Sequence, residues 1–179
     1  MSVKKIIDSI ASRSDVDRKV MRERALAWLK SGNADQESDA KEVLTALEGF
    51  EATRALDRSE LITSLANAPL TQRVVVAFQN VQPSHTEERL IQVLLDFPGS
   101  TCAQLSGQIG WAPNTWDMGF GALCGQRSPF LRALAGTAKE GVSNNLPLLT
   151  LQVRRDDGAI CYTMKPEAVE AFKQLGFRA

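Results

Sequence analysis

The chain lacks the long apolar runs that mark membrane proteins and secreted precursors. No run of apolar residues approaches the roughly 18 to 20 that are needed to cross a bilayer. The opening segment, MSVKKIIDSIASRSD, has an apolar patch that is too short and too interrupted for a signal peptide. We therefore expect a cytoplasmic protein with no membrane partner.

Cysteine and histidine are scarce, which argues against disulfide frameworks and metal sites. The three cysteines, Cys102, Cys124 and Cys161, are an odd number with 21 and 36 residues between them. This spacing fits neither a disulfide framework nor a paired-cysteine zinc pattern, so we expect small buried hydrophobic side chains. The single histidine, His85, lies where a helix begins, with no cysteine close in sequence to complete a metal site.

Motifs of catalysis are also missing. The sequence contains no glycine-rich phosphate loop, no GxSxG elbow and no HExxH pair. We therefore predict a protein that is not an enzyme and that uses no cofactor and no metal.

Charge is balanced over the 179 residues but is unevenly distributed. The 21 basic and 21 acidic side chains give a net charge of zero, which argues against a surface coated in positive charge. Residues 1–30 carry eight basic and four acidic side chains, a net charge of +4, whereas residues 31–60 carry three and eight, a net charge of −5. Helices of opposite sign can pair within one chain or across two chains in a homodimer, and the first arrangement is the simpler one.

Apolar residues at helical spacing predict helices through the first half of the chain. The pattern favours amphipathic helices over 15–33 and 36–56. Asp57 and Glu60 have the spacing of a capping box, so a new short helix is expected at 61–67.

The segment LTQRVVVAFQNVQP is ambiguous, and it is followed by the best candidate for a domain boundary. Its apolar residues recur at helical spacing, although three consecutive valines favour a strand; we predict a helix. Pro83 then disfavours helical backbone at Gln82, and Ser84 with Glu87 forms another capping box. We therefore expect a helical region over 1–83, used for packing or dimerisation, and a second domain over 84–179.

The second domain begins with three helices around a tight turn. The capping boxes at Ser84 and Thr101 start the first two helices, and a Gly-Trp-Ala-Pro turn ends the second. Asn114 is expected to cap the third helix. The residues predicted for the core of this domain are Leu90, Leu94, Leu105, Ile109, Trp116, Phe120 and Leu123, and those predicted for the outward face of the third helix are Thr115, Met118, Ala122 and Gln126.

A strand pair and a last helix follow. The runs LLTLQV and AICYTM are rich in β-branched and aliphatic residues, and Asp157-Gly158 between them is a strong hairpin signal. The segment 166–176 has Pro in its first turn and Gly after its last, so a final helix is expected.

This order of elements resembles the winged helix-turn-helix family of DNA-binding domains over about residues 84–179. The segments STCAQLSGQIGWAPNTWDMGFGALC and YTMKPEAVEAFKQLG are similar to small winged-helix modules that occur beside bacterial endonuclease and modification domains. The resemblance implies a mainly α fold, in which an N-terminal helical region precedes a winged-helix module with a small antiparallel β-hairpin.

Three features depart from the usual family pattern. Gly119 and Gly121 each cost the third helix about 1 kcal/mol relative to Ala, and close packing of another backbone is one explanation. The outward face of this helix is poor in the side chains that usually read base edges. An insert over 128–147 separates the helix from the hairpin.

The resemblance implies binding of double-stranded DNA and a role in transcription regulation or as an accessory module. The third helix would approach the major groove, and the hairpin would meet phosphates. Residues 118–155 hold five basic side chains, including Arg132 and Lys139, against Glu140, a net charge of +4. The candidate nucleic-acid contacts are Asn114, Thr115, Met118, Gln126, Arg127, Arg154 and Arg155. The alternative is a protein-interaction or assembly module on the same scaffold, for which the apolar Met118-Ala122 surface is suited.

Overall fold

The computed structural model describes residues 3–30, 34–132 and 145–178. The chain divides into two compact units, residues 1–61 (unit 1) and 62–179 (unit 2). The division falls earlier than the sequence predicted, because the helix before Pro83 packs with the second unit. The predicted mainly α class is confirmed, with one small antiparallel sheet. Within the described residues, no helix combines the length and the apolar character needed to span a membrane.

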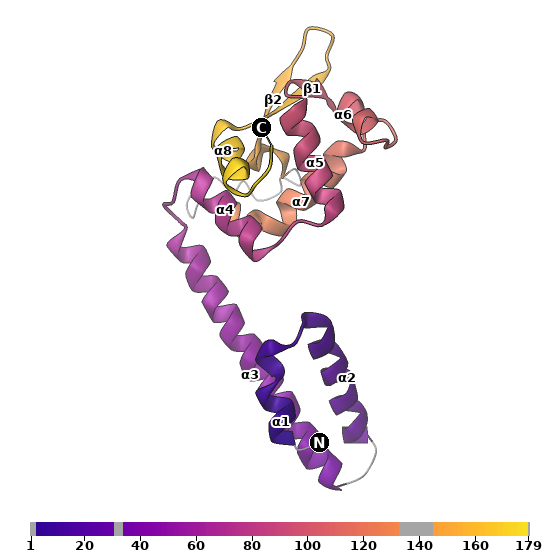
Figure 1. Cartoon of the computed structure of the whole chain (residues 1–179), viewed down its shortest axis with the longest axis vertical. Coiled ribbons are helices and arrows are strands. Elements are labelled where there is room, and N and C mark those ends of the chain that lie inside the picture. Colours follow the sequence, from indigo (N-terminus) through magenta and orange to yellow (C-terminus); the bar gives the residue numbers. More distant parts are fainter. Residues whose placement is uncertain (1–2, 31–33, 133–144, 179) are drawn as a thin grey trace. The chain divides into compact units, whose positions relative to one another are not determined.

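Unit 1 is helical. Figure 1 shows α1 and α2 beside the long α3, which continues past the unit boundary. The bounds of its elements are α1 (Val3–Asp8), η1 (Ile10–Ser12), α2 (Asp15–Lys30) and α3 (Ala34–Ser64). Its buried cluster is small and consists of Ile10, Ala25, Ala40, Val43 and Leu47.

The helix α3 runs unbroken where the sequence predicted an interruption. Asp57 and Glu60 were expected to cap a new helix, and this prediction was wrong. A capping box acts on backbone N–H groups that have no intrahelical acceptor, and these exist only at a helix start. No Pro or Gly stands between Gly49 and Pro69, and the segment is rich in Ala, Leu, Glu and Arg, which favour helix.

Unit 2 contains the sheet and the remaining helices. Their bounds are α4 (Leu70–Asn80), α5 (His85–Asp96), β1 (Ser100–Thr101), α6 (Cys102–Gln108), α7 (Trp116–Leu131), η2 (Leu146–Leu148), β2 (Thr150–Arg154), β3 (Ile160–Met164) and α8 (Pro166–Gln174). The ambiguous valine segment is the helix α4, as predicted, because Val74 and Phe78 face the core. The helix α7 extends past the predicted start of the insert, and residues 133–144 of that insert lie outside the described part of the chain.

Two of the three helix caps predicted for unit 2 are present. Ser84 and Glu87 form a reciprocal capping box at α5, and Thr101 and Gln104 form one at α6. The third prediction was wrong, since Thr115 and not Asn114 is the N-cap of α7. Asn114 instead has a φ of 60°, a left-handed conformation that asparagine adopts more readily than most residues.

The sheet is antiparallel, with the strand order β1-β3-β2. The hairpin between β2 and β3 turns at the predicted Asp157-Gly158, where Gly158 has a φ of 82° and the Asp157 carboxylate accepts from Ala159 N at 3.0 Å. The strand β1 was not predicted, because two residues are too short to give a periodic pattern. It pairs Thr101 with Cys161 and so joins the start of α6 to the sheet.

The core of unit 2 is built around aromatic rings. Trp116 stacks on Phe120 with their centroids 4.8 Å apart, and its indole N–H donates to the carbonyl of Leu90 at 3.2 Å. Phe78 of α4 meets Phe172 of α8 edge to face at 4.9 Å. All of the residues that the sequence predicted for this core are buried. The three cysteines are buried and free, also as predicted.

Candidate functional site

Side chains of α6 fix the start of α7. Ser106 is buried, and its Oγ accepts hydrogen bonds from the backbone N–H groups of Thr115 at 3.2 Å and Trp116 at 3.0 Å. Cys102 Sγ accepts a third from Asp117 N at 3.4 Å. These N–H groups open α7 and have no partner within the helix, so α6 supplies acceptors that a local cap normally provides. The angle between the two helices is held by these bonds.

Two of the cysteine thiols are kept protonated by their surroundings. Burial raises the pKa of Cys102, and the neighbouring Asp117 carboxylate adds to this. Burial raises the pKa of Cys124 to about 12. Because the thiolate is the nucleophilic form, neither group is poised for covalent chemistry.

The two faces of α7 are divided as the sequence predicted. Trp116, Phe120 and Leu123 point into the core, whereas the outward residues begin with the half-buried Thr115 and continue with exposed side chains. Those exposed side chains are Met118, Ala122 and Gln126. Met118 is 74% exposed, although methionine is apolar.

The glycines of α7 have different surroundings. A Cβ at Gly119 would lie 3.0 Å from Leu90 Cδ1 and 3.1 Å from Trp111, so side chains, rather than the expected backbone, pack against it. A Cβ at Gly125 would meet Asn145 Nδ2 at 2.9 Å. The nearest atom to a Cβ at Gly121 would be 4.0 Å away, so close packing does not explain this glycine.

A shallow hollow of about 340 Å³ adjoins the outward face of α7. Its lining residues are Asp117, Met118, Gly121, Ala122, Gly125, Asn145 and Leu146. Asp117 brings negative charge, and none of the described lining residues is basic. This surface is smooth, because three of its α7 positions are glycine or alanine.

Arg127 was predicted to contact nucleic acid, and this prediction was wrong. Its side chain is fully buried and lies over the Phe78 ring, with Cζ 4.4 Å from the ring centroid. Its guanidinium donates to Glu87 Oε1 at 3.0 Å and to the carbonyls of Val81 and Leu123, each at 3.0 Å. The sequence held a signal for this burial: Arg127 follows Leu123 by four residues and so continues the buried stripe of the helix.

Glu87 serves both the α5 capping box and the Arg127 ion pair. Burial alone raises the pKa of its carboxyl, but hydrogen bonds from Arg127 and Ser84 and attraction to Arg127 outweigh burial and lower the pKa below its ordinary value of 4.5. The carboxylate is therefore ionised when it faces Arg127. This pair ties α7 to the start of α5.

The other candidate contacts lie at two places. Asn114 and Gln126 are exposed near the two ends of the outward face of α7, and Arg154 and Arg155 are exposed on the β2–β3 hairpin. Arg155 pairs with Asp157 at 3.1 Å, which offsets part of the positive charge of the hairpin. Arg132 donates to Asn145 at 3.1 Å. Lys139 and Glu140, which entered the predicted charge surplus, lie outside the described residues.

A metal centre has no support in the described ranges. No group of three or more His, Cys, Asp or Glu side chains that could hold an ion occurs there. His85 is exposed, and its Nδ1 lies 3.6 Å from a carboxylate oxygen of Glu88.

Comparison of the chain with protein-family models, with curated proteins and with solved structures found no match. A function for the chain is therefore inferred from the arrangement of its own side chains.

Proposed function

We propose that unit 2 is a winged-helix module that docks a protein partner through the outward face of α7. Support for the winged-helix arrangement comes from the order α5, β1, α6, α7, β2, β3 and from a sheet in which β3 lies between β1 and β2. Winged helices are used for protein binding as well as for DNA binding, so the character of the exposed face decides between these functions.

The main observation that supports a protein-binding function is the exposed side chain of Met118. Covering a methionine side chain is worth about 1.5–3 kcal/mol, and its flexible thioether adapts to irregular partner surfaces. Gly121 and Ala122 beside it allow a partner to approach the helix closely. One large apolar side chain among small residues is a suitable anchor for a protein interface.

The charges near α7 support the same choice. With Arg127 buried against Glu87, the face loses the cation that the DNA hypothesis placed at its far end. Asp117 in the first turn of α7 would repel phosphates. Phosphate contacts supply most of the nonspecific affinity for DNA. Thr115, Met118, Ala122 and Gln126 carry no cation, and the exposed Arg132 at the end of α7 is hydrogen-bonded to Asn145, so this face favours a protein partner.

Site-specific photocrosslinking tests this proposal. A photoreactive amino acid at position 118 should form an adduct with one protein species in a lysate of cells that make the chain, and the same group at position 174 on α8 should not. Met118→Glu should then abolish copurification of that species, while Leu151→Glu, a matched change of an exposed apolar residue on β2, should not. Equal adducts at both positions, or a partner retained by Met118→Glu, would contradict the proposal.

Binding of double-stranded DNA by a regulator or accessory module is the second candidate. The observation that favours it is the exposure of Arg154 and Arg155 on the hairpin. A titration of random duplex at about 50 mM and about 200 mM salt should then show binding that weakens as salt rises. The double substitution Arg154→Ala, Arg155→Ala should reduce the salt slope by about 2.

Arg178→Ala, a change of an exposed arginine elsewhere in unit 2, is the control for this titration. The absence of binding at the lower salt concentration would discard the DNA candidate. Arg127→Ala is unsuitable as a binding variant, because it removes a core ion pair.

A further inference from the structure

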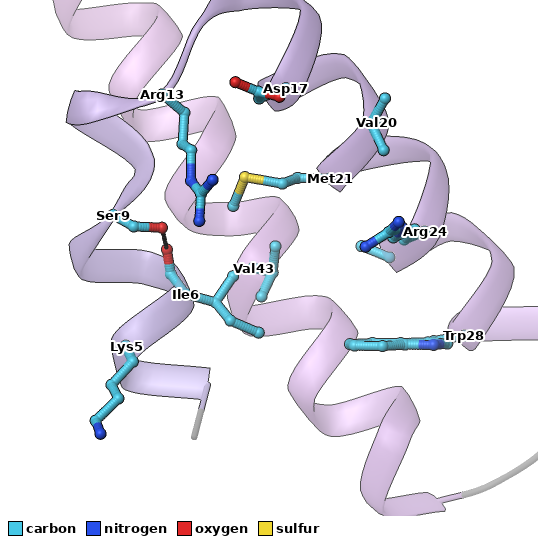
Figure 2. A pocket seen from close by; sticks show the side chains of 11 residues that line it. Lys5, Ile6, Ser9, Arg13, Asp17, Val20, Met21, Arg24, Trp28 and Val43 are labelled. Carbon is cyan, nitrogen blue, oxygen red and sulfur yellow. Dashed lines mark hydrogen bonds between the residues drawn. The ribbon is translucent and has the colours of Figure 1, made fainter. Parts of the chain in front are cut away.

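Unit 1 contains an apolar groove that the function proposed for unit 2 leaves unused. It lies between α1 and α2, with Val43 of α3 at its floor, and has a volume of about 490 Å³. Figure 2 shows Ile6 of α1 and Met21 and Trp28 of α2 lining the space between the helices. A groove of this size with apolar walls is large enough for side chains of a docked helix.

Basic residues stand at both ends of the groove. Arg13 lies at one end and Lys5 at the other, with Arg24 along the α2 side (Figure 2). Asp17 is the acidic lining residue, and hydrogen bonds from Ser14 to its carboxylate lower its pKa. Within the described residues, the side chains of Lys5 and Arg24 make no hydrogen bond or ion pair. Asp17 lies beside Arg13 and offsets part of its charge (Figure 2), but three basic lining residues against one acidic residue leave the groove positive. The groove therefore suits an apolar segment with acidic ends.

The chain itself displays such a segment on α3. Glu48, Ala52, Leu56 and Glu60 follow one another at intervals of four, which places them in one row along the helix. All four are exposed, and Leu56 is 65% exposed. The row thus presents two apolar side chains between two carboxylates, the complement of the groove.

The lengths of the row and the groove also agree. Twelve residue steps from Glu48 to Glu60 correspond to about 18 Å of helix. The α2 residues that line the groove extend from Asp17 to Trp28, eleven steps or about 16 Å. A helix laid along the groove would bring its acidic ends near the basic ends of the groove.

The row cannot fill the groove of its own chain. The first part of α3 already forms the floor through Val43, and the same unbroken helix carries the row onward on the side away from the buried Val43 and Leu47. We propose that the groove binds the Glu48–Glu60 row of a second copy, so that two chains form a reciprocal dimer. Each chain then contributes one groove and one row, which gives a closed two-fold interface.

Light scattering on the full chain across about 5–200 µM, a range suited to micromolar affinities, tests the dimer directly. A groove variant, Lys5→Glu with Arg13→Glu, and a row variant, Glu48→Lys with Glu60→Lys, should each weaken dimerisation about tenfold or more. An equal mixture of the two variants should restore it, because each interface of the mixed dimer again pairs unlike charges. Leu56→Asp, a change of an exposed side chain, should also dissociate the dimer.

Lys4→Glu with Lys19→Glu is the matched control, since both residues are exposed in unit 1 and neither lines the groove. It should leave the dimer unchanged, and so should Met118→Glu in unit 2. A monomer throughout the concentration range would overturn the proposal. So would a dimer whose affinity is insensitive to both charge-reversal variants, or one that the mixture fails to restore.

Discussion

Unit 2 and unit 1 stabilise their helices in different ways. Unit 2 buries stacked aromatic rings, and its buried polar side chains Ser106, Thr150 and Arg127 all have hydrogen-bond partners within the unit. Unit 1 buries a cluster of only aliphatic side chains. The aromatic core of unit 2 is complete within the unit, whereas the dimer proposed for unit 1 would cover Leu56 and the groove between α1 and α2.

The two buried arginines, one in each unit, also differ in how far solvent reaches their acidic partners. Arg127 is sealed in the core, and its partner Glu87 has a side chain that is 15% exposed. Arg18 in unit 1 donates to the carbonyls of Ile10 and Arg13 and pairs with Asp15, whose side chain is 77% exposed. Solvent screens the second pair much more than the first, so the two arginines should contribute unequally to folding.

The largest expected effect is the loss of Arg127. Arg127→Met should lower the free energy of unfolding of unit 2 by about 3 kcal/mol, because it removes the charge that pairs with the Glu87 carboxylate and the guanidinium donor to the Val81 carbonyl. Urea unfolding measures this loss, and Gln126→Met on the exposed face, expected to change stability by less than about 0.5 kcal/mol, is the control. A loss below about 1 kcal/mol for Arg127→Met would show that the Arg127–Glu87 pair contributes little to the stability of unit 2.

The next effect concerns the link between α6 and α7. Ser106→Ala should cost about 1–2 kcal/mol, since it leaves the first N–H groups of α7 buried without an acceptor. Urea unfolding again measures the loss, with Gln108→Ala on the exposed side of α6 as the control. If both variants unfold at the same urea concentration as the parent, the Ser106 hydroxyl does not hold the two helices together.

A smaller effect is expected in unit 1. Arg18→Met removes the hydrogen bonds and the contact of the guanidinium with the Phe50 ring, so the free energy of unfolding should fall by about 1 kcal/mol. Circular dichroism during urea unfolding follows the loss, and Lys19→Met on the exposed face of α2 controls for the change of charge. A loss as large as that of Arg127→Met would remove the contrast between the units.

The smallest effect is the acid sensitivity of the Glu87 pair. The pKa of the Glu87 carboxyl in the folded chain lies below its ordinary value of 4.5, so the ionised carboxylate stabilises the fold fully above about pH 4.5. The contribution is lost as pH falls through the lowered pKa. The free energy of unfolding of unit 2 should therefore decline less steeply below pH 4.5 in Glu87→Gln than in the parent. Urea unfolding at several pH values measures this decline. Equal slopes of unfolding free energy against pH in the two proteins would contradict the prediction.

Local signals in the sequence predicted the local features of the fold. The capping boxes at Ser84 and Thr101 depend on neighbours three residues apart, so they could be recognised without tertiary structure. The same pattern at Asp57 was misleading, because a cap stabilises only the start of a helix, and α3 is continuous through this position. The link from Ser106 to the start of α7 joins residues about ten positions apart and depends on the packed angle between two helices.

The candidate site was predicted in its position but not in its character. Helical spacing placed Met118 and Gln126 on the outward face of α7, where the structure has them. The winged-helix resemblance made Arg127 a candidate nucleic-acid contact at the far end of the third helix, although its spacing from Leu123 placed it on the buried stripe. Its burial depends on the partner Glu87, forty residues away in the sequence. Charge counted along a sequence therefore overstated the positive charge available to a nucleic acid.

Hydrogen exchange of the intact chain at two protein concentrations tests the contrast between the units most directly. The amides of α5 and α7 should be the most protected and should exchange at the same rate at both concentrations, since the core of unit 2 is complete within one chain. The amides of α2 and of the first half of α3 should exchange faster and should slow as concentration rises, because the second copy of the proposed dimer would cover the groove. Equal protection in both units, with no dependence on concentration, would contradict the account.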